Sequence, residues 1–158
     1  MDKFYQDVLR GLQSSPKYLE SKYFYDETGD QLFQQIMASP EYYLTKCELE
    51  IFSAQSQNLV STITKELKEF DVVELGAGDA LKSTYLLKSL LERNIPFSYL
   101  PVDISENVIS LLEKNLPHTL PGLQLKGFNG EYFDMLKKVN AYSKKNKVVL
   151  FLGSNIGN

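Results

Sequence analysis

The sequence predicts an α/β fold in which a doubly wound parallel sheet follows an N-terminal helical segment. Two observations lead to this prediction. From about residue 70 onward, short apolar strands alternate with amphipathic helices. The apolar runs at residues 72–73 and 148–152 are continuous, as in strands that are buried on both faces of a sheet. Before residue 70 the apolar residues recur at helical spacing, so we divide the chain into a segment of residues 1–69 and a domain of residues 70–158.

The N-terminal segment contains two expected helices. Apolar side chains predict the first over about residues 30–38, where Ser39-Pro40 ends it. Thr45 and Glu48 have the spacing of a capping box, in which each side chain accepts a hydrogen bond from the other residue's backbone N–H. The apolar period that follows predicts a helix from this cap to about Leu67.

The domain is expected to follow the order β-α-β-α-β-α-β. The expected elements are the strand 71–75, the helix 81–93, the strand 97–100, the helix 106–115, the strand 123–126, the helix 131–139 and the strand 147–152. Right-handed crossovers between parallel strands then place helices on both faces of the sheet.

Composition excludes several classes of function. A net charge of -3 gives the protein no electrostatic reason to bind nucleic acid or an anionic membrane surface. The single cysteine, Cys47, cannot form an intramolecular disulfide, and no apolar run is long enough to span a bilayer. No group of residues has the spacing of a metal site. We therefore expect a cytoplasmic protein with a small-molecule ligand.

The segment most suggestive of ligand binding is the turn after the first strand, which contains Gly76 and Gly78. Glycines there let the backbone approach a ligand closely, and ligands of open α/β sheets bind at the carboxyl ends of strands. The dinucleotide fingerprint needs a third glycine where this chain has Leu81, which argues against a nicotinamide- or flavin-dependent oxidoreductase. Glu74 and Asp79 flank the glycines, and an acidic site suits a cationic sulfonium or an amine. A glycine-rich turn without a ligand is the alternative.

One further residue and one further loop are expected at the same carboxyl edge of the sheet as the glycine turn. Asp103 ends the second strand, where a carboxylate can accept hydrogen bonds from both hydroxyls of a ribose. Asp103 could instead cap the next helix, and the glycine turn upstream favours the ribose. Residues 153–158 form a loop of small residues after the fourth strand, and an ordinary Gly/Asn turn is the alternative there.

Several motifs occur along this chain in the same order as in one known family. The motifs are Tyr23-Phe24-Tyr25-Asp26, Pro40-Glu41-Tyr42-Tyr43 with Thr45 and Glu48, Glu74-Leu75-Gly76-Ala77-Gly78 with Lys82, Pro101-Val102-Asp103, and the ending Phe-Leu-Gly-Ser-Asn-Ile-Gly-Asn at residues 151–158. From about Gly11 to Asn158, the chain is similar to the histidine-specific, S-adenosylmethionine-dependent methyltransferases. The ending and the Glu-Tyr-Tyr cluster are more specific than the glycine turn.

The resemblance implies roles for individual residues. Those expected to bind S-adenosylmethionine are Gly76, Gly78, Lys82 and Asp103, with Glu131 and Tyr132 near the adenine in place of the family's usual Asp-Phe pair. Those expected to face the amino-acid substrate are Tyr25, which is also the candidate catalytic residue, Tyr42, Gly153 and Asn158. The alternative for the tyrosines is packing in the core, for which Phe24 and Tyr43 are the better candidates.

The resemblance also implies a function and an incomplete fold. We expect an amino-acid N-methyltransferase, with the α-amino group of L-histidine as the acceptor. The family's Rossmann-like sheet has about seven strands, so this chain would be an N-terminal portion, truncated after the fourth strand. That strand would lie beside the first and expose residues 148–152 to self-association. The alternative is a non-catalytic module that binds a nucleoside or S-adenosylmethionine.

Overall fold

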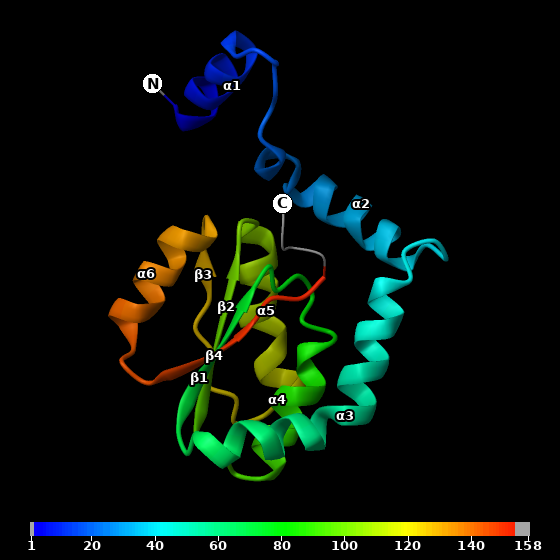
Figure 1. Cartoon of the computed structure of the whole chain (residues 1–158), viewed down its shortest axis with the longest axis vertical. Helices are drawn as coiled ribbons and strands as arrows, with labels where there is room; N and C mark the ends of the chain where they lie inside the picture. Colours follow the sequence, from blue (N-terminus) through cyan, green and yellow to red (C-terminus); the bar gives the residue numbers. More distant parts are fainter. Residues whose placement is uncertain (1, 154–158) are drawn as a thin grey trace.

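The computed structural model describes residues 2–153, and the expected substrate contact Asn158 lies outside them. The N-terminal segment forms α1 (Lys3–Gln13), the 3₁₀ helix η1 (Ser21–Phe24), α2 (Glu27–Ala38) and α3 (Leu44–Glu66). In Figure 1, α1 and α2 lie beyond one end of the sheet, while α3 runs down its side. Within the described residues, no helix is both long enough and apolar enough to cross a membrane.

Side-chain caps fix where the first two long helices begin. The Asp2 carboxylate accepts a hydrogen bond from the Phe4 N–H, and the Asp26 carboxylate accepts one from the Gly29 N–H at 2.8 Å. Because Asp26 is the N-cap, α2 begins three residues earlier than the apolar spacing alone predicts. The helix α1 was not expected from the sequence.

The predicted parallel sheet is confirmed. Its strands are β1 (Phe70–Leu75), β2 (Phe97–Asp103), β3 (Phe128–Asn129) and β4 (Asn146–Leu150), in the order β3-β2-β1-β4. All pairs are parallel, and β4 lies beside β1 as expected. Pro101 lies inside β2, which continues to Asp103 instead of ending at residue 100.

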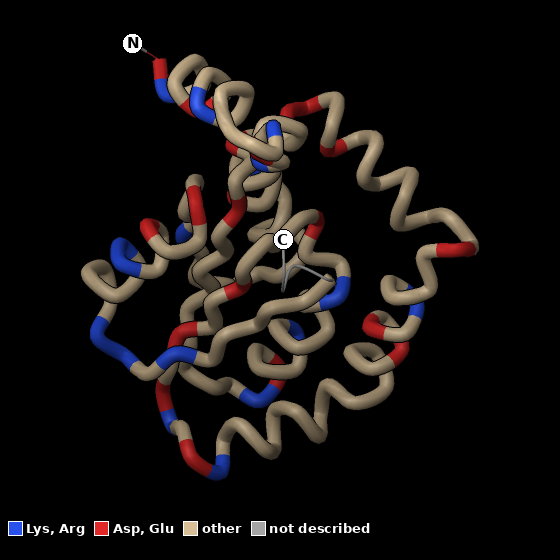
Figure 2. Tube along the Cα trace, turned by 45° about the horizontal axis from the view of Figure 1, so that its top comes forward, with Lys and Arg blue, Asp and Glu red and all other residues tan. Residues whose placement is uncertain are grey.

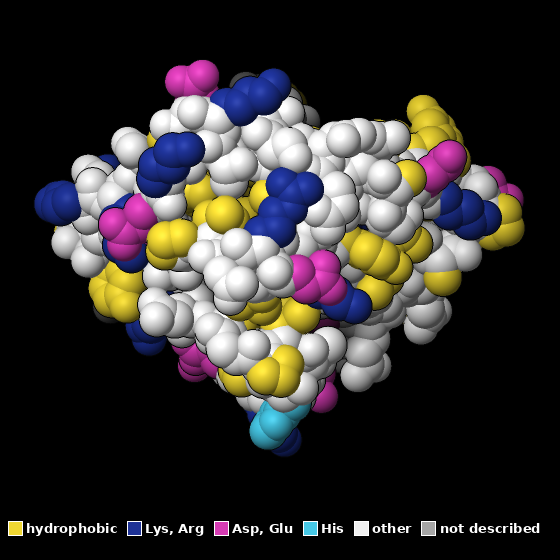
Figure 3. All heavy atoms as spheres, turned by 90° about the horizontal axis from the view of Figure 1, so that it is seen from below, with side chains coloured by type: hydrophobic (Ala, Val, Ile, Leu, Met, Phe, Trp, Pro, Cys, Tyr) yellow, Lys and Arg dark blue, Asp and Glu magenta, His cyan; other side chains and the backbone are white. Residues whose placement is uncertain are grey.

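Helices cover both faces of the sheet, which confirms the doubly wound arrangement. On one face, α3, α4 (Ser83–Glu92) and α5 (Glu106–Thr119) pack on β1 and β2. On the other face, α6 (Tyr132–Tyr142) covers Val73, Leu100 and Val102. The face seen from below in Figure 3 carries apolar side chains only in small patches between polar ones.

The residue range predicted for the third strand, 123–126, is wrong. Residues 123–126 run along β2 through a single bridge between Tyr99 and Leu125, and regular pairing begins only at Phe128. The Gly127 N–H between them donates to the Glu113 carboxylate at 2.8 Å instead of to a strand. This side-chain contact interrupts the ladder.

The capping box at the start of α3 is wrong as well. The helix begins at Leu44, so its N-cap is Tyr43, which makes no side-chain capping bond. Thr45 therefore lies two residues beyond the N-cap and does not cap the helix. Its hydroxyl has no hydrogen-bond partner among residues 2–153, and the Glu48 carboxylate contacts Lys82 and Gly153 instead.

Two smaller expectations also fail. Phe24 and Tyr43, expected in the core, are exposed, since 66% of Phe24 and 63% of Tyr43 are accessible to solvent.

Candidate functional site

A cavity of about 340 Å³ lies at the carboxyl ends of β1 and β2, beneath η1 and α2. The sequence-predicted residues that line it are Tyr25, Tyr42, Gly76, Gly78, Lys82, Asp103, Glu131, Tyr132 and Gly153. These residues come from six separate parts of the chain. The topology therefore brings together every described candidate that the sequence offered.

The glycine turn is held against the end of β2 by backbone hydrogen bonds. The N–H groups of Gly76 and Ala77 both donate to the Val102 carbonyl, at 2.8 and 3.3 Å. Gly76 and Gly78 have φ values of 69° and 54°, which a side chain would strain. A Cβ at Gly78 would meet no atom within 4 Å, so the turn leaves open space beside it for a ligand.

Asp103 joins the glycine turn to the next helix. One carboxylate oxygen accepts a hydrogen bond from the Gly78 N–H at 3.1 Å, and the other accepts one from the Ser105 N–H at 3.0 Å. Burial raises the pKa of Asp103, while these backbone donors act in the opposite direction. The helix cap itself is Ser105, whose hydroxyl accepts from the Val108 N–H. The capping alternative for Asp103 is therefore not needed, and each of its oxygens keeps acceptor capacity on the cavity side.

Glu74 is a buried acid beneath the cavity. Its side chain is 2% exposed, and the Tyr99 hydroxyl donates to its carboxylate at 2.5 Å. Burial raises the pKa of Glu74 to about 7, which the hydrogen bonds from Tyr99 and Ser83 only partly offset. Glu74 and Asp79 both line the cavity as expected, Glu74 as a buried acid, and the acidic lining also includes Glu20, Asp30, Asp103 and Glu131.

Glu48 connects three elements around the site. One oxygen pairs with the Lys82 ammonium at 2.6 Å, and the other accepts a hydrogen bond from the Gly153 N–H at 2.8 Å. The carboxylate therefore ties α3 to the start of α4 and to the loop that follows β4. The sequence indicated Glu48 only as a helix cap. Its occurrence with Thr45 shortly after the motif Pro40-Glu41-Tyr42-Tyr43 was the available signal for a role in the site.

Aromatic rings form the wall on the side of the N-terminal segment. Phe33 lies between Tyr25 and Tyr42, with edge-to-face contacts at centroid distances of 6.3 and 6.4 Å. On the opposite wall, the ring of Tyr132 contacts Phe151 at 5.6 Å. Both expected substrate tyrosines therefore lie on the cavity surface and not in the main core.

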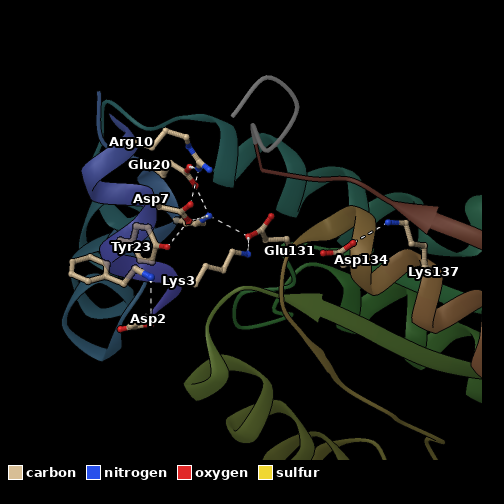
Figure 4. A network of polar contacts seen from close by, with 11 residues as sticks. Asp2, Lys3, Asp7, Arg10, Glu20, Tyr23, Glu131, Asp134 and Lys137 are labelled. Carbon is tan, nitrogen blue, oxygen red and sulfur yellow. Dashed lines mark hydrogen bonds and ion pairs between the residues drawn. The ribbon is translucent and has the colours of Figure 1, made fainter. Parts of the chain in front are cut away.

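Glu131 makes ion pairs across the mouth of the cavity. Its carboxylate contacts the Lys3 ammonium at 2.6 Å and the Lys22 ammonium at 3.2 Å (Figure 4). These contacts lower the pKa of Glu131. Lys3 and Lys22 were not identified from the sequence, because a partner more than a hundred residues away leaves no local pattern.

The residues present fit S-adenosylmethionine. The carboxylate of Asp103 would accept from the ribose, the glycine turn would border the cofactor, and acidic side chains suit its cationic sulfonium. Within residues 2–153, the Thr45 hydroxyl is a buried polar group without a hydrogen-bond partner, and it lines the same cavity. Such a group needs a polar partner, which a water molecule or a polar atom of a bound ligand would supply. Those residues also contain no cluster of side chains that could hold a metal ion.

Comparisons with known proteins show the family and its cofactor. A model of the histidine-specific, S-adenosylmethionine-dependent methyltransferases matches residues 4–158. The histidine N-alpha-methyltransferase of Mycobacterium tuberculosis is 34% identical over 153 residues, which are 97% of this chain and 46% of that protein. The enzyme of the same name from Mycolicibacterium smegmatis is 31% identical over the same shares.

A more distant relative carries a different substrate in its name. The 4-dimethylallyltryptophan N-methyltransferase easF of Claviceps purpurea is 26% identical over 161 residues, covering 99% of this chain and 46% of that protein. The chain thus spans about half the length of these curated relatives.

Proposed function

Because this chain belongs to the family of histidine-specific, S-adenosylmethionine-dependent methyltransferases, we propose that it forms the cofactor-binding portion of an amino-acid N-methyltransferase. The α-amino group of L-histidine is the first candidate acceptor, since two relatives are named for that reaction. The relative named for 4-dimethylallyltryptophan makes a second amino acid worth testing.

The observation that carries this proposal is the shared position of Asp103 and the glycine turn. A buried carboxylate with free acceptor capacity faces the same cavity as a backbone turn with room beside it. This combination fits a nucleoside whose two ribose hydroxyls donate to one carboxylate. Lys82 and Thr45 line the same cavity and would receive the polar end of the cofactor.

S-adenosylmethionine supplies a methyl group activated by the positive charge on sulfur. An unprotonated amine bound beside it would take up that methyl group, the electron pair of the broken carbon–sulfur bond would stay on sulfur, and the nitrogen would then lose a proton. The protein's task is positioning, which contributes several kcal/mol in aligned reactions of this kind. Tyr25, as the candidate catalytic contact, and Tyr42, near the imidazole, would face the amino-acid substrate, with Gly153 bordering the same cavity.

Two features support the view that a further part of the protein completes the fold. Val149 of β4 is 50% exposed, although it belongs to a strand of the parallel sheet. Large apolar side chains on α1, η1 and α2 are also exposed, among them Leu9, Phe24 and Ile36. A second copy of the chain pairing along residues 148–152 is the other way to cover β4, and light scattering distinguishes the two.

Calorimetry with S-adenosylhomocysteine tests the site. Asp103→Ala should lower its affinity more than tenfold, because a charge-assisted hydrogen bond contributes about 1.5–3 kcal/mol. Asp134→Ala, which removes an exposed carboxylate of α6, is the matched control and should leave the affinity unchanged. Equal affinities of the two variants would overturn the site.

A methyl-transfer assay tests the reaction. Histidine and 4-dimethylallyltryptophan are offered separately to the full-length protein. Methylated histidine supports the first candidate. Cofactor binding without transfer to either amino acid would favour the non-catalytic module.

A further inference from the structure

Charged side chains join the N-terminal segment to the α/β domain. Lys22 of η1 contacts the carboxylates of Asp7, Glu20 and Glu131, with distances of 2.8 Å to Asp7 and 3.2 Å to Glu131. Figure 4 shows Asp7 and Glu20 on one side of this group and Glu131 on the other. In Figure 2, Lys/Arg and Asp/Glu positions lie close together where the N-terminal segment approaches the domain. One ammonium therefore links α1, η1 and the start of α6.

This group is partly removed from water, unlike an ordinary surface ion pair. The Asp7 side chain is 5% exposed and that of Lys22 is 20% exposed. Hydrogen bonds from Lys22 and from Tyr23 hold the pKa of Asp7 at about 2, well below its usual value. The loss of Lys22 would leave a buried carboxylate with less compensation, which is costly.

Before α3, few side chains attach the chain to the domain by apolar packing. Besides Lys22, the links are polar: the Lys3–Glu131 ion pair at 2.6 Å and the hydrogen bond that the Ser105 hydroxyl donates to the Asp30 carboxylate at 2.6 Å. The residues of α1 that are buried are Asp7 and Gly11, and neither η1 nor α2 contains a buried residue. Yet this segment contributes Glu20, Lys22 and Tyr25 to the wall of the cavity. That wall is therefore held by ion pairs, hydrogen bonds and partly exposed ring contacts, and not by fully buried apolar side chains.

We propose that Lys22 is a positioning residue for cofactor binding. By holding α1 and η1 together and against Glu131, it fixes the outer wall of the cavity that Tyr25 completes. The identity of the ligand rests on the proposed function, whereas the attachment of the segment does not.

Hydrogen exchange tests the attachment without any ligand. In Lys22→Met, the backbone amides of α1 should exchange about tenfold faster or more, while those of β2 keep their rate, because only the local opening changes. Lys22→Arg should restore protection, since it keeps the charge. Lys17→Met, which removes an exposed cation of the same segment, should resemble the wild type. Unchanged α1 exchange in Lys22→Met would overturn the proposal.

Calorimetry tests the consequence for the cavity. The affinity for S-adenosylhomocysteine should fall about fivefold or more in Lys22→Met and recover in Lys22→Arg, as the preorganisation of the wall is lost and regained. Equal affinity of Lys22→Met and wild type would refute the positioning role. No binding even to wild type would contradict the proposed function, and the exchange data would still decide the attachment.

Salt offers a second measurement if Lys22→Met fails to fold. Raising the salt from about 0.05 M to about 1 M shortens the screening length and should speed exchange of the wild-type α1 amides. Exchange that does not respond to salt would overturn the proposal.

Discussion

The first 43 residues and the α/β domain hold their structure in different ways. Every buried apolar side chain of the described chain lies at Phe52 or later, whereas ten of the seventeen exposed large apolar side chains lie within the first 43 residues. The domain forms a two-faced core together with α3. The first 43 residues depend on helix caps, ion pairs and hydrogen bonds, and their apolar surface is available to another part of the protein. The chain thus combines an α/β domain that has a packed core with a cavity wall, from the first 43 residues, that polar contacts hold in place.

The largest expected effect separates the two regions directly. Leu87→Ala removes a side chain of α4 that is 0% exposed, and it should lower the free energy of unfolding by about 2–5 kcal/mol. Leu32→Ala makes the same chemical change in α2, where the side chain is 54% exposed, and should change stability by less than about 0.5 kcal/mol. Urea unfolding followed by circular dichroism measures both. Similar losses in the two variants would mean that α2 is buried in solution.

The two regions also contain carboxyl groups whose pKa values are shifted in opposite directions. The pKa of Glu74 is raised from 4.5 to about 7 by burial, so between these values the folded state holds a proton that the unfolded state has released. The free energy of unfolding should therefore fall as the pH rises from about 4.5 to about 7, by at most on the order of 3 kcal/mol. For Asp7 the pKa is lowered from 3.8 to about 2, so its contribution is present above 3.8 and is lost as the pH falls through 2.

Urea unfolding across this pH range checks the contribution of Glu74. Glu74→Gln should flatten the fall between about pH 4.5 and about pH 7, because the amide does not titrate. Glu92→Gln, an exposed site on α4, should retain the wild-type profile. An unchanged profile in Glu74→Gln would assign the pH dependence to other groups.

The contrast between the packed domain and the first 43 residues also explains which features could be predicted from the sequence. Periodic burial in the domain leaves a repeating pattern, so the sheet, its helices and the position of β4 beside β1 follow from the residues. Gly76 and Asp103 could be predicted because a βα turn and a strand end have local signatures. Lys22 and Glu48 have partners from other parts of the chain, and nothing in their neighbouring residues identifies those partners. Glu48 in particular matched a local motif, the capping box, that the earlier start of α3 rules out.

Glu48 gives the smallest and most specific test, because its two oxygens serve different partners. Glu48→Ala removes both contacts and should cost about 1–3 kcal/mol, as expected for a lost hydrogen bond to a charged group. Glu48→Gln keeps an oxygen that can accept from the Gly153 N–H but loses the charge opposite Lys82, so it should cost less than Ala. Exchange of the Gly153 amide should speed up in Glu48→Ala and stay near wild type in Glu48→Gln.

Glu50→Gln, two residues along α3 and exposed, is the control and should leave the Gly153 amide unchanged. Faster exchange in Glu48→Gln that matches Glu48→Ala would mean that the charge, and not the acceptor oxygen, holds the loop. In that case Lys82 and Gly153 depend on one another through the carboxylate. The wall contributed by α3 would then resemble the one that Lys22 supports, fixed by charge instead of by packing.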